Sequence, residues 1–226
     1  MNLREIFNTW YEPLKQFLNS QEFINIGKQV NADRANYTVI PKQGSDLLFR
    51  VFNITDYNSL KVIILGQDPY SNPLDAFDGL AFSNAALYSP QPSLRNILKE
   101  VEVDIYDGFD LNAIGNLDLT RWSNQGVLLI NTAMSVKQHL PDSHTALWRP
   151  FTLAVIKAIC ERNDIVWLLW GKKAEAYKQF IKNSSHSVII NGHPSPLNTY
   201  NPFLGCKCFS RCNTELEARN KSKIIW

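Results

Sequence analysis

The sequence has few cysteines, no long apolar run and almost no net charge. Among its 226 residues only Cys160, Cys206, Cys208 and Cys212 are cysteines, which is sparse for a disulfide scaffold and favours a reducing, intracellular compartment. No stretch reaches the roughly 18 apolar residues that a membrane span needs, and the opening segment does not resemble a signal peptide. We therefore expect no association with a membrane.

Three further sequence features are absent, and each absence excludes a type of domain organisation or binding site. There is no internal repeat, low-complexity tract or linker, so a single domain is expected. There is no Gly-rich phosphate loop, which leaves a flavodoxin-like nucleotide-binding protein, the generic alternative, without its motif. The run Cys206-x-Cys208-x3-Cys212 lacks a clear fourth ligand or a second pair, so half-buried cysteines are expected there and no metal.

The net charge of +2 permits a nucleic-acid partner without requiring one. Residues 201–226 carry five basic side chains against two acidic ones. Such a surface could lie along phosphates, but a solvated helix face explains the pattern equally well.

Apolar strand patterns alternate with helical patterns in a chain that is 45% hydrophobic and 12% aromatic. The predicted strands are Val62–Leu65, Val127–Ile130, Ile165–Trp170 and Val188–Ile190, and the predicted helices are Ser93–Val103, Trp148–Arg162 and Ala174–Ile181. This alternation predicts βαβ units. We expect one α/β domain over residues 1–226, an α/β/α sandwich with a central four-stranded, mostly parallel sheet and helices on both faces. Residues 1–60 are expected to be helices and loops packed on it.

Polar or special residues follow each predicted strand. The four strands lead, in order, into Gly66-Gln67-Asp68-Pro69-Tyr70, Asn131, Gly171-Lys172 and Asn191-Gly192-His193-Pro194-Ser195-Pro196-Leu197. Since ligands bind at the carboxyl ends of such strands, Asp68, Asn131 and His193 form a candidate active site. Each of these residues alone could also have a purely structural role. Asp68 or His193 could be a turn residue, Asn131 a cap of the next segment, and Leu197 part of the hydrophobic core. Their occurrence together at strand ends favours a site.

These segments resemble the family 1 uracil-DNA glycosylases. That family shows Gly-Gln-Asp-Pro-Tyr-His, Gly-Leu-x-Phe-Ser, a Pro-Pro-Ser loop, Gly-Val-Leu-Leu-Leu-Asn, Leu-Leu-Trp-Gly and His-Pro-Ser-Pro-Leu-Ser. The corresponding segments here are Gly66–Tyr70, Gly79–Ser83, Ser89–Ser93, Gly126–Asn131, Leu168–Gly171 and His193–Leu197. The resemblance covers residues 40 to 226, and the combination is highly specific.

The resemblance implies hydrolysis of the N-glycosidic bond of deoxyuridine in DNA, which releases uracil, leaves an abasic site and starts base excision repair. It assigns catalysis to Asp68, which orients a water and stabilises an oxocarbenium-like sugar. It also assigns catalysis to His193, which as a neutral imidazole donates a hydrogen bond to uracil O2. The residues of the implied uracil pocket are Gln67, Tyr70, Phe82 and Asn131.

Within that pocket the Asn131 amide would donate to O4 and accept from N3–H, Phe82 would stack on the base, and Tyr70 would exclude the methyl group of thymine. Leu197 would be a wedge that fills the space left by the flipped base. The other implied DNA contacts are Pro90, Pro92, Ser93, Gly171, Lys172 and Ser195.

The implied partners are uracil-containing single- or double-stranded DNA and a DNA-mimicking protein inhibitor. The resemblance implies a monomer that needs no cofactor and no metal. It also implies an intracellular location, cytoplasmic in a bacterium and nuclear or within the host cell for a eukaryotic or viral protein.

Some positions depart from the family pattern. Ser71 replaces the histidine that usually follows the tyrosine, and Ala76–Gly79 is one residue longer than the usual Ala-His-Gly. Lys172 and Asn198 stand where serines are common. These departures bear on rate, salt dependence and inhibitor sensitivity more than on the reaction. The alternative is a catalytically weak DNA-binding descendant, against which the retention of Asp68, Asn131 and His193 argues.

Overall fold

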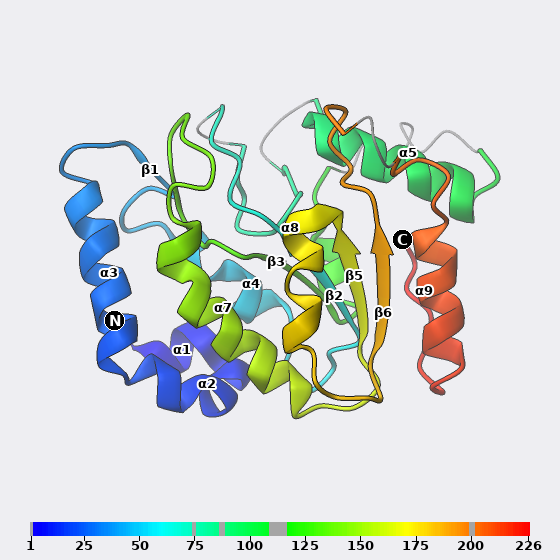
Figure 1. Cartoon of the computed structure of the whole chain (residues 1–226), viewed down its shortest axis with the longest axis horizontal. Coiled ribbons are helices and arrows are strands. Elements are labelled where there is room, and N and C mark those ends of the chain that lie inside the picture. Colours follow the sequence, from blue (N-terminus) through cyan, green and yellow to red (C-terminus); the bar gives the residue numbers. More distant parts are fainter. Residues whose placement is uncertain (1, 74–75, 86–88, 109–116, 199–201) are drawn as a thin grey trace.

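The computed structural model describes residues 2–73, 76–85, 89–108, 117–198 and 202–226. At its centre lies a sheet of the order β3-β2-β5-β6 (Figure 1). Its strands are β2 (Val62–Gly66), β3 (Val127–Asn131), β5 (Val166–Trp170) and β6 (Ser187–Asn191). All pairings among these strands are parallel. The predicted four-stranded α/β sheet is confirmed.

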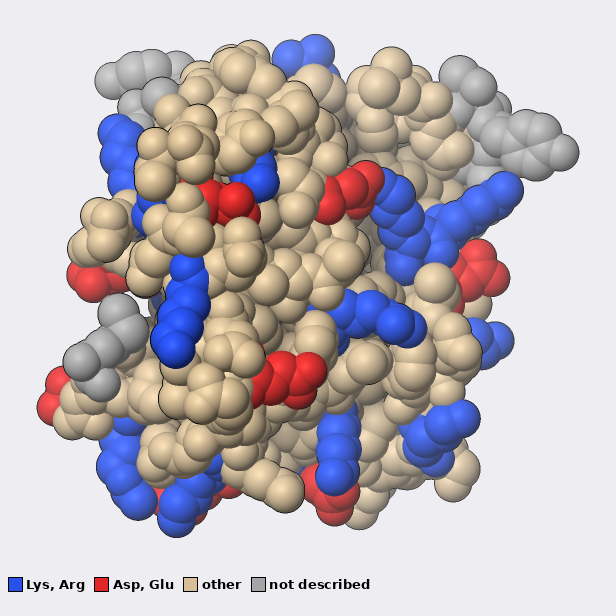
Figure 2. All heavy atoms as spheres, turned by 60° about the vertical axis from the view of Figure 1, so that its left-hand side comes forward, with Lys and Arg blue, Asp and Glu red and all other residues tan. Residues whose placement is uncertain are grey.

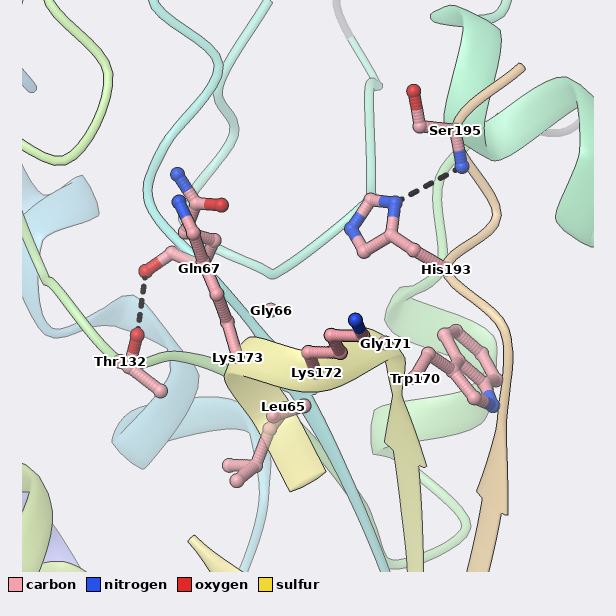
Figure 3. A pocket seen from close by; sticks show the side chains of 11 residues that line it. Leu65, Gly66, Gln67, Thr132, Trp170, Gly171, Lys172, Lys173, His193 and Ser195 are labelled. Atoms are coloured by element: carbon pink, nitrogen blue, oxygen red, sulfur yellow. Dashed lines mark hydrogen bonds between the residues drawn. The ribbon is translucent and has the colours of Figure 1, made fainter. Parts of the chain in front are cut away.

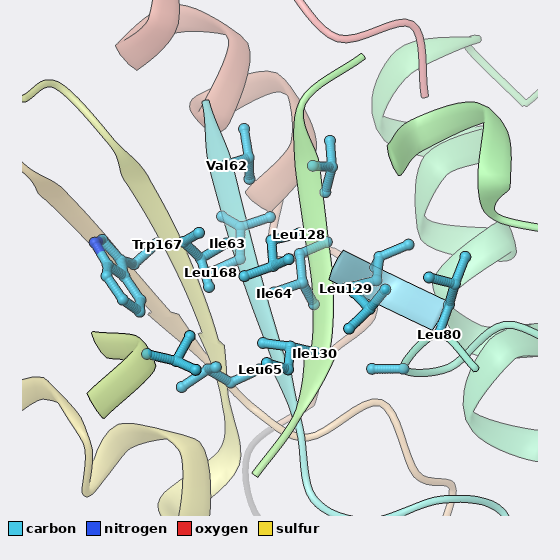
Figure 4. Packing of buried hydrophobic residues seen from close by; sticks show 14 of the residues in the cluster. Val62, Ile63, Ile64, Leu65, Leu80, Leu128, Leu129, Ile130, Trp167 and Leu168 are labelled. Atoms are coloured by element: carbon cyan, nitrogen blue, oxygen red, sulfur yellow. The ribbon is translucent and has the colours of Figure 1, made fainter. Parts of the chain in front are cut away.

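Both faces of the sheet are buried along β2, β3 and β5, whereas most residues of the edge strand β6 are half-buried. Every residue of β2, β3 and β5 is buried, as expected for strands rich in Val, Ile and Leu that are covered on both sides. Side chains alternate along a strand, so Trp167 and Trp170 of β5 point to opposite faces, and they are 0% and 1% exposed. Figure 4 shows the aliphatic side chains of the central strands packed together.

Helices from the whole length of the chain surround the sheet. They are α1 (Leu3–Phe7), α2 (Tyr11–Leu18), α3 (Gln21–Asp33), α4 (Arg50–Ile54), α5 (Pro92–Ile105), α6 (Thr120–Ser123), α7 (Thr145–Cys160), α8 (Gly171–Glu175) and α9 (Cys208–Glu217). Helices α4 and α6 contact β3, whereas α8 and α9 contact β5 and β6. None of the helices in the described part of the chain is long and apolar enough to cross a membrane.

The helices of the first 60 residues share a core with the sheet. One cluster of buried hydrophobic residues extends from Phe7 to Trp226. The Trp10 indole donates a hydrogen bond to the carbonyl of Thr55 at 2.7 Å, which ties the N-terminal helices to the segment that precedes β2. A two-stranded antiparallel ribbon, β1 (Val39–Ile40) with β4 (Val136–Lys137), was not predicted, because two-residue strands carry no periodic pattern.

One predicted helix is shorter than expected. The segment Ala174–Ile181 was predicted to be helical, but α8 covers Gly171–Glu175 and a 3-10 turn follows at Lys178–Phe180. Ala176 N–H still donates to Lys172 O, four residues earlier, as in an α-helix. Tyr177 N–H instead donates to Ala174 O, three residues earlier, as in a 3-10 helix. This tightening turns the Tyr177 ring into the core, where it is 8% exposed.

Candidate active site

The carboxyl edge of the sheet gathers the loops that follow its strands, as Figure 3 shows for Gln67, Thr132 and His193. Beyond the ladder of β2 and β3, Thr132 N–H donates to Gly66 O at 3.0 Å and Ala133 N–H donates to Gln67 O at 2.9 Å. The Thr132 hydroxyl also donates to Gln67 O, at 2.9 Å. The first residues after β2 therefore continue the sheet and hold Gln67 and its neighbour Asp68 in place.

Asp68 is a half-buried residue whose carboxylate accepts two hydrogen bonds. Its Oδ2 accepts from Asp142 N–H at 2.7 Å, and its Oδ1 accepts from the Gln67 amide at 3.2 Å. Burial is the main cause of the raised pKa of Asp68, and the hydrogen bond from Asp142 N–H opposes it. The carboxylate is thus held in a fixed direction, in surroundings where a nearby positive charge would stabilise it.

The ring of His193 is held in one tautomer when it is neutral. Ser195 N–H lies 3.0 Å from Nδ1, and since a backbone N–H can only donate, Nδ1 is the acceptor and Nε2 carries the proton. Burial and the charge of Lys173 lower the pKa of His193. The Asn198 amide donates to His193 O at 3.0 Å, which fixes the backbone of the same loop. His193 therefore offers an N–H donor without a positive charge.

Two glycines allow the site residues to approach the sheet. A Cβ at Gly66 would lie 2.1 Å from Asn131 Oδ1, so the Asn131 side chain lies across Gly66, its partner in the β2–β3 register. A Cβ at Gly171 would lie 2.8 Å from His193 Cβ, and Gly171 has φ +82°, a conformation that disfavours other residues. No larger residue fits at either position without moving Asn131 or His193.

Phe82 lies against the same site in a strained turn. It has φ +65°, is 9% exposed, and its ring lies 5.4 Å from Trp170 and 6.2 Å from His193, centroid to centroid. The Tyr70 hydroxyl donates to Phe82 O at 3.1 Å. Burial, followed by the charge of Asp78, raises the pKa of Tyr70 well above its usual range, so Tyr70 stays a neutral donor.

The longer segment at Ala76–Gly79 supplies a buried carboxylate that holds this turn. Asp78 accepts hydrogen bonds from the Ser83 hydroxyl at 2.6 Å and from Ala85 N–H at 2.9 Å. The Arg50 guanidinium donates to Asp78 O at 2.7 Å. Burial raises the pKa of the Asp78 carboxyl group, and the hydrogen bonds from Ser83 and Ala85 and the charge of Arg50 oppose the rise. The departure from the family pattern is thus a structural brace behind Phe82.

A cavity of about 320 Å³ opens beside these residues. The cavity is lined by residues at the carboxyl ends of the strands and by two lysines of α8. The lining residues are Leu65, Gly66, Gln67, Thr132, Trp170, Gly171, Lys172, Lys173, Ala174, His193 and Ser195. Among the described residues no group of three His, Cys, Asp or Glu side chains is placed to hold a metal ion.

Residues 52–217 match the family model of the uracil DNA glycosylase superfamily. The chain belongs to that superfamily. Curated uracil-DNA glycosylases from Bacteroides thetaiotaomicron and Streptococcus uberis are 40% and 39% identical to it, covering 98% and 97% of this chain and 99% and 98% of their own length.

The fold of this uracil DNA glycosylase superfamily member also matches solved structures. The crystal structure of mimivirus uracil-DNA glycosylase superposes with a TM-score of 0.85 at 24% identity, covering 100% of this chain and 89% of the viral one. A mimivirus UNG Y322F in complex with UGI gives a TM-score of 0.86 at 23% identity, covering 100% and 91%. At this identity the likeness concerns the fold.

The loops predicted to contact DNA also meet at this edge of the superfamily member. Pro90 is half-buried, Pro92 is the exposed first residue of α5, and Ser93 follows it. The Asn96 amide of α5 donates to Pro194 O at 2.7 Å, which joins this loop to the His193 loop. Exposed Lys172 and half-buried Ser195 line the cavity.

Leu197 lies at the tip of the last loop. Its side chain is 90% exposed, so the reading of Leu197 as a core residue is wrong. Leu197 N–H donates to Ser195 Oγ at 3.3 Å and Asn198 N–H to Ser195 O at 2.9 Å. A short local turn thus presents an apolar side chain to solvent next to the cavity.

Arg219, Lys221 and Lys223 of the basic C-terminal segment of the superfamily member make ion pairs or hydrogen bonds within the fold. Arg219 pairs with Glu215, and Lys223 with Glu217 at 3.0 Å. The Lys221 ammonium donates to Asp164 O at 2.7 Å, just before β5. These groups lie near the amino ends of the strands, opposite the cavity. On the face shown in Figure 2 basic and acidic side chains are interspersed.

Sequence reasoning missed two residues that the structure places at the site. Asp142 and Lys173 come from the segment before α7 and from α8, and they form an ion pair beside Asp68. No motif marks either of them. The adjoining Gly171-Lys172 was the only signal that could have directed attention to Lys173.

Proposed function

We propose that this chain is a family 1 uracil-DNA glycosylase, which hydrolyses the N-glycosidic bond of deoxyuridine in DNA, releases uracil and leaves an abasic site for base excision repair. Membership of the superfamily and the 40% identical relatives support the reaction. The observation that carries the residue roles is the pairing, at one sheet edge, of a carboxylate and an imidazole whose tautomer is fixed with the proton on Nε2.

Asp68 would act on the sugar. Cleavage at the anomeric carbon develops positive charge on the deoxyribose, and a fixed carboxylate stabilises that charge more in the transition state than in the ground state. The same carboxylate would orient the attacking water. The two hydrogen bonds that it accepts, at 2.7 and 3.2 Å, fix its direction before substrate arrives.

His193 would act on the departing base. Uracil leaves as an anion with charge on O2, and a neutral Nε2–H donor stabilises it without transferring a proton. The Ser195 N–H that occupies Nδ1 enforces this role. Burial and Lys173, which lower the pKa of His193, keep the imidazole neutral near neutral pH.

Side chains at the carboxyl edge of the sheet would recognise the uracil base. Asn131, buried at 6% exposure, pairs its amide with O4 and N3–H, which rejects cytosine because the donor and acceptor would both face like groups. Phe82 stacks on the base, with about 1–3 kcal/mol for such contacts. Tyr70 closes the pocket at C5 against thymine, and Gln67 completes the lining.

DNA would lie across the exposed loops around the cavity. Pro90, Pro92, Ser93 and Ser195 are placed to hold phosphates near the lesion, together with Gly171 and Lys172, where a lysine point charge replaces the usual hydroxyl. Exposed Leu197 would enter the duplex as the base leaves it. We expect this surface to accept both single- and double-stranded substrates.

The same proposal includes a monomer in an intracellular location, where its DNA substrate is. A DNA-mimicking protein inhibitor would occupy the surface that the DNA uses. Because Lys172 replaces a hydroxyl on that surface, inhibitor affinity is expected to depend on salt concentration.

The test is incubation of the purified protein with an oligonucleotide that carries one uracil, followed by alkali, which breaks the strand at abasic sites. Cleavage at the uracil is expected on single and double strands, and a thymine-containing oligonucleotide of the same sequence should stay intact. A variant carrying both Asp68→Asn and His193→Leu is the protein control. Binding of the uracil strand without any cleavage would favour the DNA-binding alternative over the enzyme.

A further inference from the structure

An ion pair links two loops of the active site. Lys173, on α8, donates through Nζ to Asp142 Oδ2, and their side chains are 62% and 45% exposed. An exposed pair of this kind contributes little to stability. Its place between the loops that hold Asp68 and His193 calls for another explanation.

Asp142 holds the catalytic carboxylate through its backbone. Its N–H donates to Asp68 Oδ2 at 2.7 Å, and Asp142 adopts φ +66°, which is uncommon for a residue other than glycine. Thr145 N–H donates to Asp142 O at 3.0 Å. The direction of the N–H, and therefore of the Asp68 carboxylate, depends on how this turn is held.

The segment is also anchored on its far side, and the Thr145 hydroxyl donates to Asp142 Oδ1 at 3.3 Å. His144 is 1% exposed, and its ring bonds to Ser135 at 2.8 Å and to Asp33 at 3.0 Å. This Ser-His-Asp arrangement is not a second catalytic site, since Ser135 is 0% exposed. On the exposed side of the turn, the Lys173 pair is the described contact that reaches from Asp142 to α8.

The charges of the pair also act on both catalytic groups. The Asp142 carboxylate is a like charge that raises the pKa of Asp68, while Lys173 lowers it. The charge of Lys173 also disfavours the imidazolium form of His193, whose ring lines the same cavity (Figure 3). The charged groups that act on Asp68 are Asp142 and Lys173, and the one that acts on His193 is Lys173.

We infer that Lys173 is a positioning residue for uracil excision: through its ion pair with Asp142 it fixes the turn whose backbone N–H orients Asp68. This inference rests on the proposed function. The ion pair uses the Asp142 side chain, so the Asp142 N–H can donate to the Asp68 carboxylate. The positive charge of Lys173 also offsets the repulsion between the Asp142 and Asp68 carboxylates. One cation therefore favours an ionised Asp68 and a neutral His193 together.

The test compares Lys173→Met, Lys173→Arg and Lys178→Met by single-turnover cleavage at saturating enzyme, as a function of pH. Lys178 lies on the exposed 3-10 turn after α8 and serves as the matched control for loss of one positive charge. Without Lys173 the pKa values of Asp68 and His193 both rise. Both active forms, the Asp68 carboxylate and the neutral His193 imidazole, are lost as pH falls. The acid limb of the pH–rate profile should therefore move to higher pH in Lys173→Met.

Lys173→Arg should keep the acid limb of the pH–rate profile at the parental position, because an arginine can still pair with Asp142. Adding Asp142→Asn to Lys173→Met removes the uncompensated like charge and should move the limb back towards the parental position. Melting temperatures should be nearly equal throughout.

Two results would overturn the positioning role. In the first, Lys173→Met has the rate and the acid limb of Lys178→Met. In the second, DNA binding weakens while the limb stays in place, which would make Lys173 a phosphate contact. The parental protein is measured in the same assay, so a parent that releases no uracil refutes the proposed function, whereas an active parent with an unaffected Lys173→Met refutes only this inference.

Discussion

Replacing Leu197 by alanine separates a DNA-directed role from a structural one. A leucine that is 90% exposed keeps only a tenth of its surface from water, so its removal should cost about 0.2–0.3 kcal/mol, against about 1.5–3 kcal/mol for full burial. In a chain of this size that corresponds to a melting-temperature change of about 1 °C or less. Leu197→Ala should therefore be as stable as the parent.

The effect should appear with duplex DNA. Extruding a paired base costs a few kcal/mol, and a leucine buried between base pairs would return about 1.5 kcal/mol of it. Loss of that contribution should slow uracil removal from a duplex about ten-fold. Single-stranded substrate should be much less affected, because no partner stack opposes extrusion there.

Two matched variants complete the experiment, which combines melting curves with paired assays on single and double strands. Leu168→Ala, at a position that is 0% exposed, should lose about 2–5 kcal/mol of stability without a selective duplex defect. Ile225→Ala, at a position that is 74% exposed and hydrogen-bonded to Gln125 before β3, should change neither property. Equal slowing of both substrates by Leu197→Ala would refute the wedge.

Three further predictions follow from the site. Asp68→Asn and His193→Leu should each lower single-turnover cleavage by about 10²–10³-fold while a filter-binding assay finds DNA affinity nearly unchanged; a near-parental rate in either variant would remove that residue from catalysis. Asn131→Asp should begin to release cytosine, because a carboxyl group can accept from the N4 amino group of cytosine and, when protonated, donate to N3; a variant that releases uracil but no cytosine would contradict the proposed recognition of the base by Asn131. Gly171→Ala should lose about 10²-fold in rate, since the new Cβ would lie 2.8 Å from His193 Cβ. Gly205→Ala, at φ +83° with nothing within 4 Å, carries the same backbone strain and should keep its activity.

The strands and the site edge could be predicted from sequence because each rests on local patterns. Val62–Leu65 and Val127–Ile130 are apolar runs that stop at special residues, and the structure extends each by one residue, to Gly66 and Asn131. The convergence of Asp68, Asn131 and His193 followed from the rule that parallel strands place their loops at one edge.

What could not be predicted depends on contacts between distant residues. The exposure of Leu197 is a property of the folded loop, and the same sequence fits a buried residue equally well. The contact between Asp142 and Asp68 joins residues 74 positions apart, in a turn with no periodic pattern. The shortening of α8 reflects burial of Tyr177, a tertiary contact that overrides a helical pattern.

The hydrogen bonds that extend the β2–β3 ladder into the site have a consequence for its dynamics. Thr132 N–H and Ala133 N–H are bonded to the carbonyls of Gly66 and Gln67, so their exchange with deuterated solvent requires opening of the sheet itself and should be as slow as that of the core. The Leu197 and Asn198 N–H groups donate to Ser195, a hydrogen-bonding partner in the same short turn, and should exchange by local opening. The groups proposed to recognise the base and cleave the bond would thus rest on a slowly exchanging part of the protein, while the exposed tip at Leu197 would rearrange by local opening of its own turn.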